Sequence, residues 1–363
     1  MGNGKTRLFG SIKPMRLVMA AAVAACAYGS SPSMAQEPAA GTDPFAPGQV
    51  IDFRETMRKL VQNVSAFGRG LNPNFVILAD AGLGLVSKPN PEDDTQLFPA
   101  RTYIRSIDGV LQPNLLTKLE PPAPGPEGAK EDPAMIEARK TLNINLKMAQ
   151  QMGLKVFDLE FADKPKAIDA ALAKSTAKGF VPFIANSPFL GQLPAYPKSA
   201  YNANPISLSD LTRAKNFLYI GHSQGFGTTT DYIQQLAMTN HDVVITSVFH
   251  GRTPLSKLDV DRLKYKKLGA RRLVLAEIDV SSAATYHYYW QPGWGMGSPA
   301  YINVPFVEDP DRYRTAYWDP AWQALLYGDI NSYLYGIADL GFDGVLLKGV
   351  NAWRYFESGG EEQ

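Results

Sequence analysis

Two predicted strands each carry a pair of carboxylates spaced two residues apart. Asp158 and Glu160 belong to the third predicted strand, and Glu277 and Asp279 to the seventh. Residues two apart in a β-strand point to the same face, so the members of each pair share a face. Hydrolysis of a glycosidic bond needs two carboxyl groups, one protonated and one ionised, on either side of the bond. If the strands end at a common opening, these four residues could supply such a pair.

A lysine on the last predicted strand supports a second interpretation of these acids. Lys348 lies next to the seventh strand, where its ammonium could pair with Glu277 or Asp279. An ammonium within ~4 to 6 Å lowers the pKa of a carboxyl group and disfavours the protonated form that a general acid must keep. The acids would then be structural ion pairs. A lysine buried at a strand end could also form a Schiff base, but no other residue supports a lyase.

The elements around these residues alternate between short apolar runs and helical patterns. Several helical patterns end directly before a glycine, as expected of βα units that build a parallel sheet. Eight units predict an α/β protein with a single (β/α)8 TIM barrel, whose chemistry lies at the C-terminal ends of the strands. Asp80 and Asn351, after the first and last strands, are therefore candidate binding residues. The predicted strands are residues 75–79, 102–107, 155–161, 180–185, 216–220, 242–249, 272–280 and 344–349.

The beginning of the chain has the pattern of a bacterial export signal. Basic residues precede an apolar run at residues 17–27, which is too short to span a membrane, and Ser33 and Ala35 suit signal peptidase. Cys26 ends a lipobox-like Val-Ala-Ala-Cys, where cleavage would leave a lipid anchor, but cleavage after Ala35 is favoured. We expect a secreted or periplasmic protein. Its expected parts are a signal peptide at residues 1–35, a flexible leader at 36–56, a barrel at 57–357 and a tail at 358–363.

Composition excludes several classes of function. Cys26 is the only cysteine, so the folded part has no disulfide, catalytic thiol or cysteine-ligated metal. The four histidines lack the spacing of metal ligands, and no Gly-x-Gly-x-x-Gly turn follows an early strand. Removing residues 1–35 takes away four of the 36 basic residues and none of the 35 acidic ones, which leaves a formal charge of −3. We therefore expect no metal, no cofactor and no nucleic-acid partner.

The pentapeptide at residues 221–225, Gly-His-Ser-Gln-Gly, matches the nucleophile elbow of serine esterases. A later acid with His250 or His287 could complete a triad. An elbow serine is followed at once by a helix, whereas residues 226–230 have the pattern of a loop and an N-cap. Such short matches arise often by chance. A serine esterase is thus a minor alternative, and His222 and Gln224 are predicted to contact a ligand.

Aromatic residues gather after the seventh predicted strand. Residues 286–290 are Tyr-His-Tyr-Tyr-Trp, and such rings can stack on sugars or pack against one another. Residues 290–318, rich in Trp, Tyr, Gly and Pro, are expected to form a long loop over the C-terminal face of the barrel. Tyr288 and Trp290 are the candidate ring contacts to a ligand.

Six phrases spread along the chain are specific when taken together. They are MRKLVQN (57–63), LNPNF (71–75), AKNFLY (214–219), YHYYW (286–290), YWDPAWQ (317–323) and GFDGV (341–345). In these phrases the chain resembles the endo-α-1,4-polygalactosaminidase group, glycoside hydrolase family 114, from about Met57 to Phe356. The resemblance implies a TIM barrel that acts on a polysaccharide rich in amino sugar.

The chain departs from that family at several acidic positions. Where the family's last strand has a Tyr-Leu-Asp type motif followed by a further Asp, this chain has Lys348 and Asn351. A Gly-Glu-Ala-Glu type motif after the seventh strand is replaced by Ser-Ser-Ala-Ala at residues 281–284, and the sixth strand's Asp by Ser247. Only Asp158 stands where the resemblance implies an acid.

Two classes of function therefore remain open. One is an endo-acting glycosidase with rearranged acids, for which the catalytic candidates are Asp158, Glu277 and Asp279. The other is a non-catalytic polysaccharide-binding or export accessory protein. In either case the ligand is an extracellular polysaccharide, and we expect the acids of the third and seventh strands to converge at one opening. The candidate binding residues are Asp80, Glu160, His222, Gln224, Tyr288, Trp290, Lys348 and Asn351.

Overall fold

A helix, α1 (Phe53–Leu71), opens the folded part of the computed structural model, which describes residues 51–93, 96–121 and 131–360. The predicted signal peptide, Cys26 and most of the leader lie outside these residues. The compact unit begins at Phe53, so residues 53–56, expected as leader, belong to the first turn of this helix. The reason is aromatic packing, because the ring of Phe53 lies 5.1 Å from that of Trp318 and 5.6 Å from that of Phe356.

The described residues form one large parallel sheet that is nearly closed into a barrel. Its strand order is β6–β5–β4–β1–β15–β11–β8–β7, eight strands in all. No hydrogen-bonded pairing joins β6 to β7, but Phe183 of β6 packs on Phe217 of β7 with ring centroids 5.4 Å apart. The (β/α)8 architecture is thus confirmed. The strands are β1 (Val76–Asp80), β4 (Gly109–Pro113), β5 (Lys155–Phe161), β6 (Val181–Ala185), β7 (Phe217–Ile220), β8 (Val243–Thr246), β11 (Leu273–Asp279) and β15 (Gly344–Lys348).

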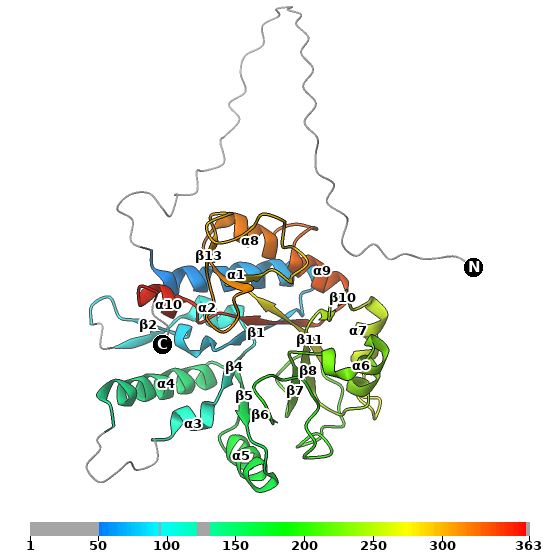
Figure 1. Ribbon diagram of the computed structural model, residues 1–363. Helices are drawn as coiled ribbons and strands as arrows, with labels where there is room; N and C mark the ends of the chain where they lie inside the picture. Colours follow the sequence, from blue (N-terminus) through cyan, green and yellow to red (C-terminus); the bar gives the residue numbers. More distant parts are fainter. Residues whose placement is uncertain (1–50, 94–95, 122–130, 361–363) are drawn as a thin grey trace, which may run out of the picture. The chain divides into compact units, whose positions relative to one another are not determined.

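Helices surround the barrel strands (Figure 1), with α1 against α9 and α6 against α7. None of the described helices is both long and apolar enough to cross a membrane. The helices after α1 are α2 (Arg101–Ser106), α3 (Leu115–Leu119), α4 (Pro133–Gln151), α5 (Pro165–Ala177), α6 (Thr229–Ala237), α7 (Lys257–Leu263), α8 (Pro320–Leu326), α9 (Tyr333–Asp339) and α10 (Trp353–Glu357), with short 3-10 helices η1 (Gly82–Leu85) and η2 (Gln224–Phe226).

Three small antiparallel sheets are inserted after barrel strands. The hairpin β2 (Ser87–Pro89) and β3 (Leu97–Pro99) follows β1, and β9 (Phe249–His250) pairs with β10 (Thr253–Pro254) after β8. The third is a three-stranded sheet of β12 (Ser282–Ala284), β14 (Arg312–Thr315) and β13 (Ile302–Pro305) after β11. The expected long loop at residues 290–318 therefore contains two strands of its own.

One of the eight predicted strands is wrong. Residues 102–107 lie mainly in helix α2, and the second barrel strand is β4, which starts at Gly109. Tyr103 and Ile104 are buried while Arg101 and Arg105 are exposed, a spacing that also fits a helix. Gly109 permits the close strand packing, because a Cβ there would lie 2.6 Å from the backbone oxygen of Lys155.

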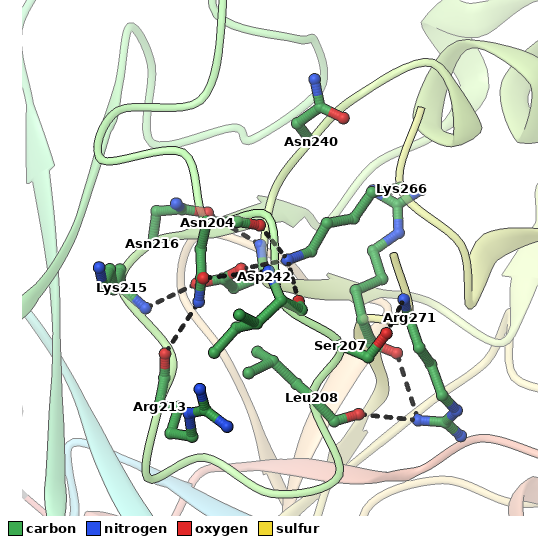
Figure 2. Close-up of polar contacts among 12 residues, drawn as sticks. Asn204, Ser207, Leu208, Arg213, Lys215, Asn216, Asn240, Asp242, Lys266 and Arg271 are labelled. Atoms are coloured by element: carbon green, nitrogen blue, oxygen red, sulfur yellow. Dashed lines mark hydrogen bonds and ion pairs between the residues drawn. The ribbon is translucent and has the colours of Figure 1, made fainter. Parts of the chain in front are cut away.

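The end of the barrel opposite the predicted site is held by a buried ion pair (Figure 2). Asp242, just before β8, bonds Lys266 at 2.6 Å, and both side chains are almost fully buried. The same carboxylate accepts the backbone N–H of Lys215 at 2.8 Å and the amide of Asn204 at 3.2 Å. This cluster fastens the connection between β6 and β7 to the barrel.

Candidate functional site

The strand register fixes which side chains point into the barrel. Asp279 of β11 pairs with Lys348 of β15, and Ala79 of β1 pairs with Leu347, which puts Asp80 beside Lys348. Cross-strand neighbours share a face of the sheet. Asp80, Glu277, Asp279 and Lys348 therefore meet on the inner face at the C-terminal end, where barrel enzymes place their sites.

Glu277 contacts two groups inside the barrel. Its Oε2 accepts a hydrogen bond of 2.7 Å from the hydroxyl of Tyr219 on β7, and the Nζ of Lys348 lies 3.7 Å from the same oxygen. Glu277, opposed by the effect of burial, raises the pKa of Lys348. Lys348 is therefore an ammonium, which argues against a Schiff base and confirms the predicted pairing of Lys348 with Glu277.

Asp279 is held in a tighter ion pair. Its Oδ2 lies 2.6 Å from Nη2 of Arg312 on β14, and its Oδ1 accepts the backbone N–H of Ser281 at 3.0 Å. Burial alone would raise the pKa of this carboxyl, but Arg312 and the neighbouring hydrogen bonds outweigh burial and lower it. Gly349 lets the chain pass close by, because a Cβ there would lie 2.8 Å from Oδ1 of Asp279. Asp279 is thus an ionised acceptor.

Asp80 differs from both acids of β11. Burial raises the pKa of its carboxyl to about 6, although Lys348 opposes the shift. Its Oδ1 is buried and has no hydrogen-bond partner among the described residues. Burial therefore favours the protonated form of Asp80 in mildly acidic solution.

We expect Asp80→Asn to make the free energy of unfolding depend less on pH between pH 4 and 6. The folded pKa lies above the unfolded value, so the stability contributed by protonated Asp80 is present below about pH 4 and is lost as the pH rises through 6. The variant should gain on the order of 1–2 kcal/mol at pH 7.5, less than the full shift implies because Asp80 is partly exposed. Urea unfolding at several pH values measures this. The exposed acid Asp261, changed to Asn, is the control, and an unchanged pH dependence in Asp80→Asn would contradict the assignment.

A cleft of about 540 Å³ opens at this end of the barrel. Its charged lining includes Glu277, Asp279, Lys348 and Arg312. Tyr288 stacks on Phe249 with centroids 5.8 Å apart, and Tyr286 donates a hydrogen bond of 2.9 Å to Asp309. Both tyrosines and their two partners also line the cleft. Tyr288 is 38% exposed and Tyr286 is 52% exposed, so their rings are accessible to a ligand.

The other predicted binding residues divide between the cleft and its surroundings. His222 and Gln224 line the cleft, and His222 stacks on Phe189 at 4.1 Å. Trp290 does not line it; its ring packs instead on Trp294 and on Tyr313 of β14. Asn351 is exposed before α10 and lies outside the lining as well.

The expected convergence of all four acids is wrong for Asp158 and Glu160. The register pairs Leu111 of β4 with Phe157, so Phe157 points inward, where its ring lies 5.1 Å from that of Phe217. The alternate residues Asp158 and Glu160 therefore face the outer helices. A barrel strand buried on both faces gives no hydrophobic signal for which of its faces is the inner one.

The outward acids form a buried pair beneath α3 and α5. Glu160 accepts the backbone N–H of Leu116 at 2.7 Å. Asp158 is fully buried next to Ser175 and Glu160, and burial raises its pKa to about 7. Neither residue lines the cleft. Asp158 and Glu160 thus have no access to a ligand bound there.

The pentapeptide at residues 221–225 does not form a nucleophile elbow. Ser223 has φ −95° and ψ −8°, an ordinary right-handed conformation, and helix α6 begins only at Thr229. Thr228 caps that helix and exchanges hydrogen bonds with Asp231. The N-cap predicted within residues 226–230 is confirmed at Thr228, but the short 3-10 helix η2 directly follows Ser223, and Thr229 and Thr230 already belong to α6.

The sequence does not predict the hydrogen-bond partners of the two cleft acids, Tyr219 for Glu277 and Arg312 for Asp279. Arg312 lies 33 residues after Asp279 in a segment with no regular pattern, so no sequence signal pairs them. Tyr219 could have been found, because it alternates with the inward Phe217 on β7. Among the described residues, no group of three or more His, Cys, Asp or Glu side chains is arranged to hold a metal ion.

Comparison with known proteins finds similarity over parts of the chain. No family model matches it. An uncharacterized protein of Deinococcus radiodurans is 36% identical over 83 residues, 23% of this chain and 26% of that protein. Uncharacterized proteins of Methanocaldococcus jannaschii and Thermotoga maritima are each 26% identical, over 132 residues (36% of both chains) and 86 residues (24% and 25%). The chain thus spans only about a quarter to a third of each relative.

Proposed function

We propose that this protein is exported and binds an extracellular polysaccharide containing amino sugars in the cleft at the C-terminal end of the barrel. The observation that carries the proposal is that Glu277 and Asp279 line a cleft that also exposes the rings of Tyr286 and Tyr288. Carboxylates accept hydrogen bonds from sugar hydroxyls and ammonium groups, and aromatic rings cover the apolar faces of sugars.

The contacts of the two acids favour binding over hydrolysis. A glycosidase needs one carboxyl that donates a proton and one that stays ionised. Arg312 and backbone hydrogen bonds lower the pKa of Asp279, and Glu277 accepts from Tyr219 beside the ammonium of Lys348. Both acids are therefore arranged as acceptors, which suits recognition of donors on a sugar.

Hydrolysis is the second candidate, and Asp80 is the observation that favours it. Its pKa of about 6 keeps a fraction of the carboxyl protonated in mild acid. Asp80 would then be the general acid and Glu277 the second carboxyl group, in place of the predicted Asp158. Asp80 is not among the residues that line the cleft, so this arrangement ranks below binding.

We expect the purified protein to bind a partly deacetylated galactosaminan or glucosaminan without releasing reducing ends. Glu277→Gln should weaken binding roughly 10- to 150-fold, because a charged hydrogen bond is worth roughly 1.5–3 kcal/mol. Calorimetric titration measures affinity, and a reducing-sugar assay measures cleavage. Glu308→Gln is the matched control, since Glu308 is exposed and outside the cleft.

The cleavage assay on the variants separates the two candidates. Cleavage that disappears in both Asp80→Asn and Glu277→Gln would favour hydrolysis over binding. Failure of the wild type to bind any member of a panel of neutral, acidic and amino-sugar glycans would overturn both.

A further inference from the structure

Ser223 and His250 contact each other at the edge of the cleft. The Oγ of Ser223 lies 3.0 Å from Nδ1 of His250, although the two residues are 27 positions apart in the sequence. Ser223 follows β7 and lines the cleft, and His250 ends β9 with its ring stacked on Tyr232 at 5.4 Å. The pair is therefore held by two separate connections of the barrel.

The surroundings of His250 fix which ring nitrogen carries the proton. Its Nε2 lies 2.8 Å from the backbone oxygen of Gly227, which can only accept a hydrogen bond. Nε2 of the neutral ring must therefore carry the hydrogen, and Nδ1 presents its lone pair to Ser223. The serine hydroxyl then donates to the histidine, which is the relation of a nucleophile to its general base.

We propose that Ser223 and His250 form a catalytic dyad that hydrolyses small acyl esters, such as O-acetyl groups carried by a carbohydrate. Oγ of Ser223 attacks the ester carbonyl carbon while its proton passes to Nδ1 of His250. The bond from the carbonyl carbon to the alcohol oxygen breaks, and His250 returns the proton to the departing alcohol. Water then attacks the acyl-serine, His250 takes a proton from it, and the carboxylic acid leaves as Ser223 recovers its hydrogen.

The rest of the geometry narrows the substrate class. The partner of Nε2 is a neutral carbonyl, which orients the ring but stabilises an imidazolium less than a carboxylate does. Esters, whose carbonyl carbon is attacked more readily than that of an amide, therefore fit better than amides. Gln224 follows Ser223 and lines the same cleft, so its amide groups are available to the oxyanion.

The dyad lies close to the acids of the cleft without sharing a residue with them. A Cβ on Gly221, two residues before Ser223, would lie 3.9 Å from Oε2 of Glu277. The loop that carries Ser223 therefore passes beside Glu277. The proposed activity still does not depend on glycan binding, because a small ester needs only Ser223, His250 and Gln224.

The test combines covalent labelling with ester hydrolysis. We expect a fluorophosphonate probe to label the protein with loss of fluoride, and peptide mass spectrometry to place the adduct on Ser223. Ser223→Ala should abolish labelling and lower kcat/KM for 4-methylumbelliferyl acetate at least about 100-fold, and His250→Gln should have a similar effect on both. Ser209→Ala is the control, because Ser209 is exposed and lies outside the cleft; its hydroxyl donates a hydrogen bond to Asp210.

Two results would overturn the proposal. One is an adduct on another residue with Ser223 unmodified, and the other is ester hydrolysis unchanged in Ser223→Ala. Glycan binding by titration is measured on the same variants. Loss of labelling with unchanged glycan binding would show that the dyad acts independently of the proposed polysaccharide site.

Discussion

Lys266→Met should lower the free energy of unfolding by about 3–5 kcal/mol, the usual cost of leaving one partner of a buried ion pair without the other. Asp242 and Lys266 are 0% and 1% exposed, and their charged atoms lie 2.6 Å apart. Lys266 also donates to the backbone oxygens of Asn204 at 2.7 Å and Ile206 at 3.0 Å (Figure 2 shows the residues around this pair). Methionine fills a similar volume but satisfies none of these acceptors.

The control for this prediction is the next residue in the chain. Lys267 is exposed, and Lys267→Met should change the free energy of unfolding by less than about 0.5 kcal/mol. Urea denaturation followed by circular dichroism measures both variants. A loss in Lys266→Met no larger than that in Lys267→Met would show that the connection between β6 and β7 is held by other contacts.

The barrel could be predicted from sequence because its strands carry strong local signals. The third and seventh strands were placed to within a residue, since their apolar runs are long and bounded by turns. The second strand failed because the two apolar residues of α2, Tyr103 and Ile104, also fit a strand. The strand begins instead at Gly109, where a Cβ would lie 2.6 Å from the backbone oxygen of Lys155.

The site could be predicted only in part, for a geometric reason. Alternation shows that two residues share a face of a strand, but it does not say which face is inside. Glu277 and Asp279 were assigned the correct face, whereas Asp158 and Glu160 were not. Pairings between distant segments, such as Arg312 with Asp279, depend on how a long connection folds back, and nothing local encodes them.

Arg312→Met is the second change for which we expect a large effect, a loss of about 2–3 kcal/mol at pH 7.5. The side chain of Asp279 is only 10% exposed and would lose its ion pair of 2.6 Å. The guanidinium is 32% exposed, so the expected cost is below that of the fully buried pair. Arg252→Met is the control, because Arg252 is an exposed cation that lines the same cleft.

The pH dependence of the stability of Arg312→Met tests whether the lost ion pair with Asp279 causes the destabilisation. In the wild type the pKa of Asp279 is lowered, so its contribution to stability is present above the unfolded pKa and is lost as the pH falls through the folded pKa. Without Arg312, only the hydrogen bonds of Ser281 and Ser282 and the charge of Lys348 would oppose burial, so the pKa of Asp279 would rise and its ionised form would contribute less stability. The deficit of Arg312→Met should thus be smaller at pH 4 than at pH 7.5. Adding Asp279→Asn to Arg312→Met should restore most of the lost stability at pH 7.5. A deficit that remains in the double variant would mean that Arg312 acts through its packing on Phe306, whose ring centre lies 4.3 Å from the guanidinium.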